Sequence, residues 1–171
     1  MCSSTLLSLP LRNLATMGRT LSQNPSTLIH RSPLIVDTDV RNLTDVMKRT
    51  LLNAEVIQLH QSTATPPGTL LGRDWSCSVD SSATVLGPCG SLYGRKADPE
   101  GSSWVVALVN EDDKVARRLT LSLSLLGWGC NATAIAKDLW NSTAVSESVT
   151  GGLARTVAPH STALVKLTLN A

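Results

Sequence analysis

The stretch Trp104-Val-Val-Ala-Leu-Val-Asn110 and the stretch Leu119-Thr-Leu-Ser-Leu-Ser-Leu125 decide the class of the fold. The first is apolar on both faces, which is typical of a central strand of a sheet. In the second, leucines alternate strictly with small polar residues, and this period of two predicts a strand buried on one face only. The polar run Asn110-Glu-Asp-Asp-Lys114 between them predicts a solvated hairpin turn.

Further short apolar segments extend this pattern to the C-terminus. The predicted strands are Thr133–Trp140, Leu153–Val157 and Ala163–Leu169. Turn residues separate them at Gly127-Trp-Gly129, Gly151-Gly152 and Ala158-Pro-His160, the last in a closing hairpin. Short strands at this spacing predict a mainly β fold, an antiparallel Greek-key β-sandwich over residues 66–171.

The chain upstream of Pro66-Pro-Gly68 predicts a different organisation. The buried strand Leu34-Ile-Val36 runs into a polar turn, and a stripe of apolar residues at helical spacing follows, with Thr44 or Asn42 as its cap. A strand followed by a helix is half of an α/β unit, so residues 28–65 form a separate segment. Residues 55–61 fit a short helix or a strand, and residues 1–27 stay unassigned, poorly ordered or helical.

The charge and hydropathy patterns exclude two classes of partner. The formal net charge is only +2 and the basic residues are scattered, whereas a nucleic-acid-binding domain concentrates them on one face. No apolar run reaches the roughly 18 residues that span a bilayer, so no membrane partner is predicted. The apolar stretch within Met1–Pro10 has no basic residue before it and is not a convincing signal peptide.

The four cysteines have no spacing typical of a zinc site, and no metal is predicted. Cys77 and Cys89 flank a turn rich in Ser, Gly and Pro, so they are either a hairpin disulfide or two free buried thiols. Asn42, Asn131 and Asn141 each begin an Asn-x-Ser/Thr glycosylation sequon. Three sequons in a chain of 171 residues favour a secreted or lysosomal protein.

Several motifs, in order along the chain, carry a family resemblance. They are Ser32-Pro-Leu-Ile-Val-Asp-Thr-Asp-Val-Arg41, Asn53-Ala-Glu-Val-Ile-Gln-Leu-His-Gln61, Trp104-Val-Val-Ala-Leu-Val-Asn110, Lys137-Asp-Leu-Trp140 and Thr156-Val-Ala-Pro-His160. Over residues 28–171 the chain resembles glycoside hydrolase family 27, which includes α-galactosidases and α-N-acetylgalactosaminidases. The resemblance implies a (β/α)8 barrel followed by a β-sandwich, of which this chain has only the last barrel strand and helix and the sandwich.

The resemblance also implies an activity, namely retaining hydrolysis of terminal α-galactosyl groups without a cofactor. The family places its nucleophile in a K-(Y/F)-D segment and its acid/base in an R-x-S-D segment, and neither segment exists in this sequence. The chain is therefore expected to be a truncated, inactive member, with galactose or N-acetylgalactosamine as the sugar of the parent enzyme. The missing barrel portion or a second copy of the chain is the expected protein partner.

Two residue pairs remain as weak functional candidates. Asp37 and Asp39 lie on one side of a strand end, but Asp39 also fits a structural role, accepting hydrogen bonds from Arg41 or from the next helix. Trp75 and Trp128 lie near turns and are candidates for stacking on a sugar, whereas the tryptophans inside strands are expected in the core. These two tryptophans support an alternative function, a stand-alone sandwich module that binds carbohydrate or protein.

Overall fold

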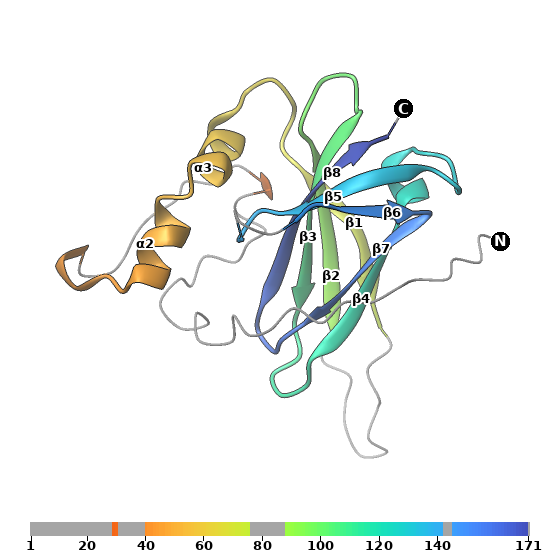
Figure 1. Ribbon diagram of the computed structural model, residues 1–171. Coiled ribbons are helices and arrows are strands. Elements are labelled where there is room, and N and C mark those ends of the chain that lie inside the picture. The colour runs from red at the N-terminus through yellow and green to blue at the C-terminus, as the bar shows by residue number, and fades with distance from the viewer. Residues whose placement is uncertain (1–28, 31–39, 76–87, 142–144, 171) are drawn as a thin grey trace, which may run out of the picture.

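The computed structural model describes residues 29–30, 40–75, 88–141 and 145–170, which form a sandwich of two antiparallel sheets (Figure 1). The larger sheet has the strand order β1 (Thr69–Asp74), β2 (Gly90–Lys96), β3 (Ser103–Asn110), β8 (Thr162–Leu169), β5 (Thr133–Asp138) and β6 (Glu147–Thr150). The smaller sheet pairs β4 (Arg117–Ser122) with β7 (Gly152–Val157). The predicted β-sandwich is confirmed.

Strand β3 lies in the middle of the larger sheet and is buried on both faces, as predicted. It pairs with β2 on one side and with β8 on the other. Val106 and Leu108 point into the core between the sheets, while Val105 and Ala107 point into a second apolar cluster on the outer face. Successive side chains of a strand alternate between its faces, so an uninterrupted apolar run is needed to fill both clusters.

The predicted strand over residues 119–125 is wrong in its second half. Strand β4 ends at Ser122, and Leu123–Leu126 form the short 3₁₀-helix η2. The Ser122 hydroxyl accepts a hydrogen bond from the backbone N–H of Ser124, and Gly127 ends the turn with a φ of 83°. Because serine side chains compete with strand hydrogen bonds, the alternation was not sufficient to continue the strand. Leu123 remains buried, but Leu125 is 49% exposed.

The predicted hairpins at residues 110–114 and at His160 are also wrong. Strands β3 and β4 lie in different sheets, as do β7 and β8, so both connections cross from one sheet to the other. Asn110, which is 1% exposed, joins the two crossings. Its Nδ2 atom lies 2.9 Å from the carbonyl oxygens of Val115 and Val157 and 3.0 Å from that of Ala158. A turn motif alone does not show which sheet the next strand joins.

Upstream of the sandwich, the 3₁₀-helix η1 (Val40–Asn42) precedes two α-helices, α2 (Asp45–Leu51) and α3 (Ala54–Gln61). Thr44 caps α2 by accepting a hydrogen bond from the backbone N–H of Met47 at 3.2 Å, one of the two predicted caps. The ambiguous residues 55–61 are helical. The predicted strand over residues 34–36 and residues 1–27 lie outside the described residues, so the division at residue 66 stays a prediction. Within the described part of the chain, no helix has the length and apolar character to cross a membrane.

Candidate functional site

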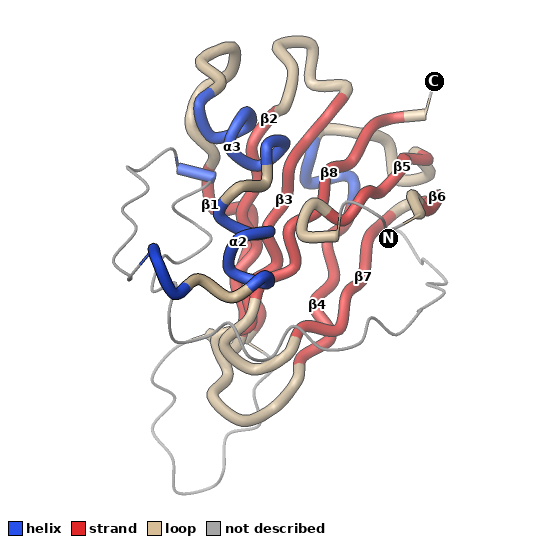
Figure 2. Tube along the Cα trace, turned by 60° about the vertical axis from the view of Figure 1, so that its left-hand side comes forward, coloured by secondary structure: helices blue, strands red, loops and turns tan. Residues whose placement is uncertain are grey.

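Helix α3 packs on the outer face of the larger sheet, on the side opposite to β4 and β7 (Figure 2). Val56 of the helix is 4% exposed and belongs to one apolar cluster with Val105, Leu139 and Leu164 from the sheet side. Leu59 packs against the same cluster. Apolar burial therefore joins a helix from the upstream segment to the sandwich.

The C-terminal end of α3 is held by a buried arginine. Arg95 of β2 is 1% exposed, and its Nη1 and Nη2 atoms donate to the carbonyl oxygens of Leu59 at 2.9 Å and Ser62 at 2.6 Å. Its Nε atom donates to the Thr65 hydroxyl at 3.2 Å. The last four carbonyls of a helix have no partner within the helix, and they attract positive charge. A planar guanidinium satisfies both requirements at once.

The N-terminal end of α3 is held by an asparagine and an ion pair. Asn53 accepts a hydrogen bond from the backbone N–H of Val56 at 3.2 Å and donates one to the carbonyl oxygen of Leu139 at 2.7 Å. Two residues along, Glu55 pairs with Lys137 of β5 at 2.6 Å. The same side chain that caps the helix therefore also fixes its start to the segment after β5.

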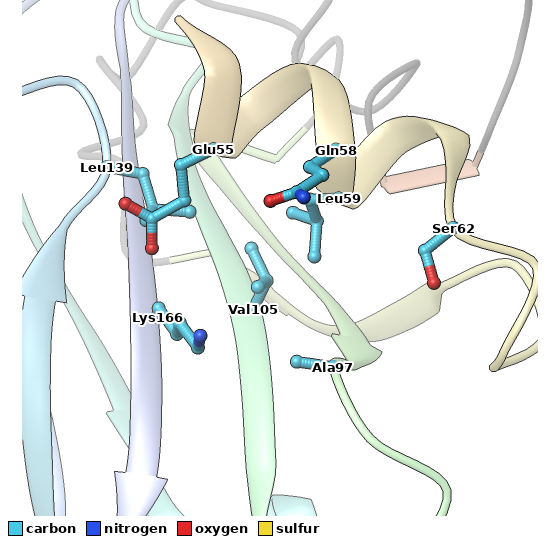
Figure 3. Close-up of a pocket in the computed structure, with 8 residues that line it drawn as sticks. All are labelled: Glu55, Gln58, Leu59, Ser62, Ala97, Val105, Leu139 and Lys166. Atoms are coloured by element: carbon cyan, nitrogen blue, oxygen red, sulfur yellow. The ribbon is translucent and has the colours of Figure 1, made fainter.

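Between α3 and the sheet lies an open groove of about 250 Å³ (Figure 3). Glu55, Gln58 and Leu59 point from the helix toward the sheet, and Lys166 of β8 lines the sheet side. The full lining is Glu55, Gln58, Leu59, Ser62, Ala97, Val105, Leu139 and Lys166. Retaining glycoside hydrolysis needs two carboxyl groups about 5–5.5 Å apart. Among these lining residues Glu55 supplies the one carboxylate, and that carboxylate is in an ion pair, so the groove lacks the groups for this chemistry.

Comparisons with known proteins show which domain this sandwich resembles. Residues 96–167 match the family described as the alpha galactosidase C-terminal beta sandwich domain. The larger part of the sandwich is therefore similar to that domain. A comparison with curated proteins finds no match.

Solved structures resemble both this α-galactosidase-type sandwich and part of the chain upstream of it. A family 27 β-L-arabinopyranosidase from Geobacillus stearothermophilus is 26% identical with a TM-score of 0.64, over 83% of this chain and 28% of its own. α-Galactosidase I from Mortierella vinacea is 22% identical with a TM-score of 0.64, over 83% and 34%. A putative α-N-acetylgalactosaminidase from Bacillus halodurans is 16% identical with a TM-score of 0.66, over 85% and 29%. The latter two likenesses show the fold alone.

The coverage of these matches bears on the upstream helices. The chain spans 28–34% of the length of these three structures. The matched 83% of this chain is longer than the sandwich itself, so the likeness includes part of the segment that contains α2 and α3.

Only some of the predicted site residues lie in the part of the chain that the structure describes. Asp37, Asp39 and Cys77 fall outside the described residues, so their assigned roles stay predictions. Trp75 follows β1 and is 60% exposed. Trp128 instead packs against the core of the α-galactosidase-type sandwich and donates its indole N–H to the carbonyl oxygen of Gly101 at 2.9 Å. Trp75 is therefore the better placed of the two for stacking.

The structure describes two of the four cysteines and all three sequon asparagines. Cys89 is disulfide-bonded, and so is Cys130. The three sequon asparagines are all on exposed positions, namely Asn42, Asn131 and Asn141. These placements are compatible with the predicted disulfide and glycans and do not test either.

The acidic turn after β3 serves the structure. The backbone N–H of Lys114 and the guanidinium of Arg117 lower the pKa of Asp112 to about 2. The carboxylate also accepts a hydrogen bond from the backbone N–H of Val115 at 2.8 Å. Among the described residues no three His, Cys, Asp or Glu side chains gather as metal ligands. The Asp112 carboxylate holds the crossing between the sheets in shape.

Sequence reasoning missed the two ends of the α3 attachment. Nothing in the pattern of β2 distinguishes the buried Arg95 from the exposed Lys96 beside it. Arginine in a strand is ordinarily exposed, so only the position of the helix end above the sheet reveals its role. Asn53 before an apolar helical pattern could have been recognised as a cap, since asparagine is a favoured N-cap residue.

Proposed function

We propose that this chain is the non-catalytic C-terminal part of an α-galactosidase-type glycoside hydrolase. Its role is to hold the last helix of a barrel, α3, in a fixed position on the sandwich. The observation that carries this proposal is the attachment of α3 at both ends, by Arg95 at its C-terminus and by Asn53 at its N-terminus. A helix that belonged to an independent unit would have no need of buried polar contacts to a sheet.

The parent activity would be hydrolysis of terminal α-galactosyl groups with retention of configuration. The match of residues 96–167 to the alpha galactosidase C-terminal beta sandwich domain supports an α-galactoside as the substrate of the parent enzyme. The likeness to the β-L-arabinopyranosidase keeps a β-L-arabinopyranoside as an alternative. An α-N-acetylgalactosaminide stays an alternative from the family resemblance, and all three substrates are glycosides.

The chain as given is proposed to be inactive. The K-(Y/F)-D and R-x-S-D segments that carry the family's two aspartates do not occur in it. In the described residues, the groove beside α3 offers one carboxylate, Glu55, which is neutralised by Lys137. A single paired carboxylate cannot supply both a nucleophile and an acid/base.

The proposed compartment is secreted or lysosomal. The disulfide-bonded states of Cys89 and Cys130 support it, because disulfides persist in oxidising compartments. The exposed sequon asparagines point the same way. The proposed protein partner is the barrel portion of the parent enzyme or a second copy of this chain.

The test of inactivity uses the purified chain and three nitrophenyl glycosides: the α-galactoside, the α-N-acetylgalactosaminide and the β-L-arabinopyranoside. We expect no turnover above the buffer rate with any of them, with an intact α-galactosidase as the positive control. Turnover that disappears in Asp37→Asn or Asp39→Asn would overturn the proposal. Turnover that survives both changes would indicate a contaminating enzyme, which a second purification through an affinity tag would remove.

A further inference from the structure

Three cationic side chains form a row across the face of the larger sheet that α3 covers (Figure 2). Strand pairing places Arg95 of β2 opposite Val105 of β3, and Val105 opposite Lys166 of β8. Lys166 is in turn opposite Lys137 of β5. Side chains that are opposite one another on neighbouring strands lie on the same face of the sheet. Lys166 is therefore the middle cation of the row.

Helix α3 provides partners for the two outer cations and none for the middle one. Lys137 forms its ion pair with Glu55, and Arg95 donates to two carbonyl oxygens at the C-terminal end of the helix. Within the described part of the chain, the half-buried Lys166 ammonium forms neither an ion pair nor a hydrogen bond. Two lysines directly opposite one another repel, and partial burial of an unpaired charge adds to that cost.

The unpaired lysine lines the groove between α3 and the sheet, whose volume is about 250 Å³ (Figure 3). Gln58 and Ser62 also line this groove, and their amide and hydroxyl groups are hydrogen-bond donors. The one carboxylate among the lining residues, that of Glu55, is matched by the charge of Lys137. The charge of Lys166 is therefore left without a counterpart in the groove.

We propose that this groove binds a small monocarboxylate through Lys166. A hydrogen bond between an ammonium group and a carboxylate is among the strong ones, and the ligand would supply the anion that Lys166 lacks. One negative charge balances the one cation that is left over, whereas a dianion would place a second negative charge near Glu55. The volume is below the roughly 300–1,000 Å³ of sites for drug-sized ligands, so we infer a ligand of a few carbon atoms.

The test is a titration of the full chain with sodium propanoate at constant ionic strength, followed by nuclear magnetic resonance. We expect saturable shifts of the Gln58 side-chain amide and of the backbone amide of Ala97, a further lining residue. Propanamide has a similar shape without the charge and is the ligand control. It should cause no saturable shift.

The charge of the lysine is tested by substitution. Lys166→Met keeps most of the aliphatic stem and should bind propanoate about tenfold more weakly, as the loss of one charge-assisted hydrogen bond predicts. Lys166→Gln should show the same loss and serves as the second variant if the first does not fold. The matched control is Lys114→Met, the same substitution at an exposed lysine in the turn after β3, which should bind as the unaltered chain does.

Four outcomes would overturn the inference. Equal affinity for propanoate in the unaltered chain and in the Lys166 variants would show that the carboxylate binds elsewhere. Absence of saturable shifts at Gln58 and Ala97 would remove the site altogether. Propanamide that binds as tightly as propanoate would show that charge plays no part. Tighter binding of inorganic phosphate than of propanoate would show that the groove selects a dianion.

Discussion

Arg95 donates a hydrogen bond from Nη1 to the carbonyl oxygen of Leu59 at 2.9 Å, and this contact ties strand β2 to the last turn of helix α3. Two further donors of the same guanidinium reach Ser62 and Thr65. The sandwich and the upstream helix are thereby one packed unit around a buried cation. Burying that cation is costly unless its donors are satisfied, so its partners are as important as its charge.

Replacement of this arginine should loosen the whole attachment. Arg95→Ala removes the guanidinium donors to the partly buried carbonyl oxygens of Leu59 and Ser62, and we expect it to lower the free energy of unfolding by about 2–4 kcal/mol. The free energy of unfolding of Arg95→Lys should lie between those of the unaltered chain and Arg95→Ala, because an ammonium group cannot reproduce the planar set of guanidinium donors. Urea unfolding measures the difference. Arg118→Ala, an exposed arginine on β4, is the control, and an equal loss in both alanine variants would contradict the buried role.

The two functions of Asn53 can be separated by substitution. Asn53→Asp retains an oxygen that caps α3 but loses the donor to the carbonyl oxygen of Leu139. Asn53→Ala loses both, with about 1 kcal/mol attributable to the cap alone. We expect hydrogen exchange of the α3 amides to quicken in the order Asn, Asp, Ala. If the α3 amides of Asn53→Asp exchange as slowly as those of the unaltered chain, the hydrogen bond from Asn53 to Leu139 does not stabilise the helix.

Stability at acid pH should depend on Asp112. Its pKa is lowered to about 2 from an ordinary 3.8, so its carboxylate stabilises the folded state fully above the ordinary value. This contribution is lost as the pH falls from about 4 through 2, where the folded state also takes up the proton. The difference in unfolding midpoint between the unaltered chain and Asp112→Asn should shrink across that window. Asp113→Asn, whose carboxylate is 74% exposed, is the control for the loss of one negative charge in the same turn.

A close approach at Gly68 predicts a steric effect. A Cβ atom there would lie 2.1 Å from Cγ2 of Ile29 and 2.6 Å from the carbonyl oxygen of Gly94. Gly68→Ala must therefore shift backbone as well as a fully buried side chain, and overpacking of this kind costs about 1–3 kcal/mol. Thermal unfolding measures it. Gly129→Ala meets nothing within 4 Å and should be neutral; if both variants melt together, Gly68 is not close-packed in solution.

Much of the fold could be predicted from the sequence, because the buried residues of a strand or a helix recur at a spacing typical of that element. The apolar residues on both faces of β3 predict a central strand, and Thr44 is one of two predicted caps, since both signals depend on neighbouring residues alone. The end of β4 could not be predicted, because a strand and a 3₁₀-helix both bury Leu123. Sheet assignment after each turn failed for a related reason: it depends on partners far along the chain.

The candidate site was less predictable than the fold. The sequence predicts Trp75 as an exposed aromatic residue near a turn, and its side chain is 60% exposed. A hollow lined mainly by residues of β1 and β4 joins strands that are more than 40 positions apart in sequence, so no local pattern reveals it. The buried Arg95 is similar, because its acceptors come from 30–36 residues upstream.

The bridging amide of Asn110 has a consequence for biogenesis. One of its acceptors, the carbonyl oxygen of Val157, is 47 residues downstream. During synthesis on the ribosome, Asn110 is therefore translated well before that partner. Contacts of such separation close late and slowly. Until Val157 is available, the Asn110 amide cannot hydrogen-bond to both crossings. At that stage the leucine-rich interior of the newly made chain is accessible to chaperones.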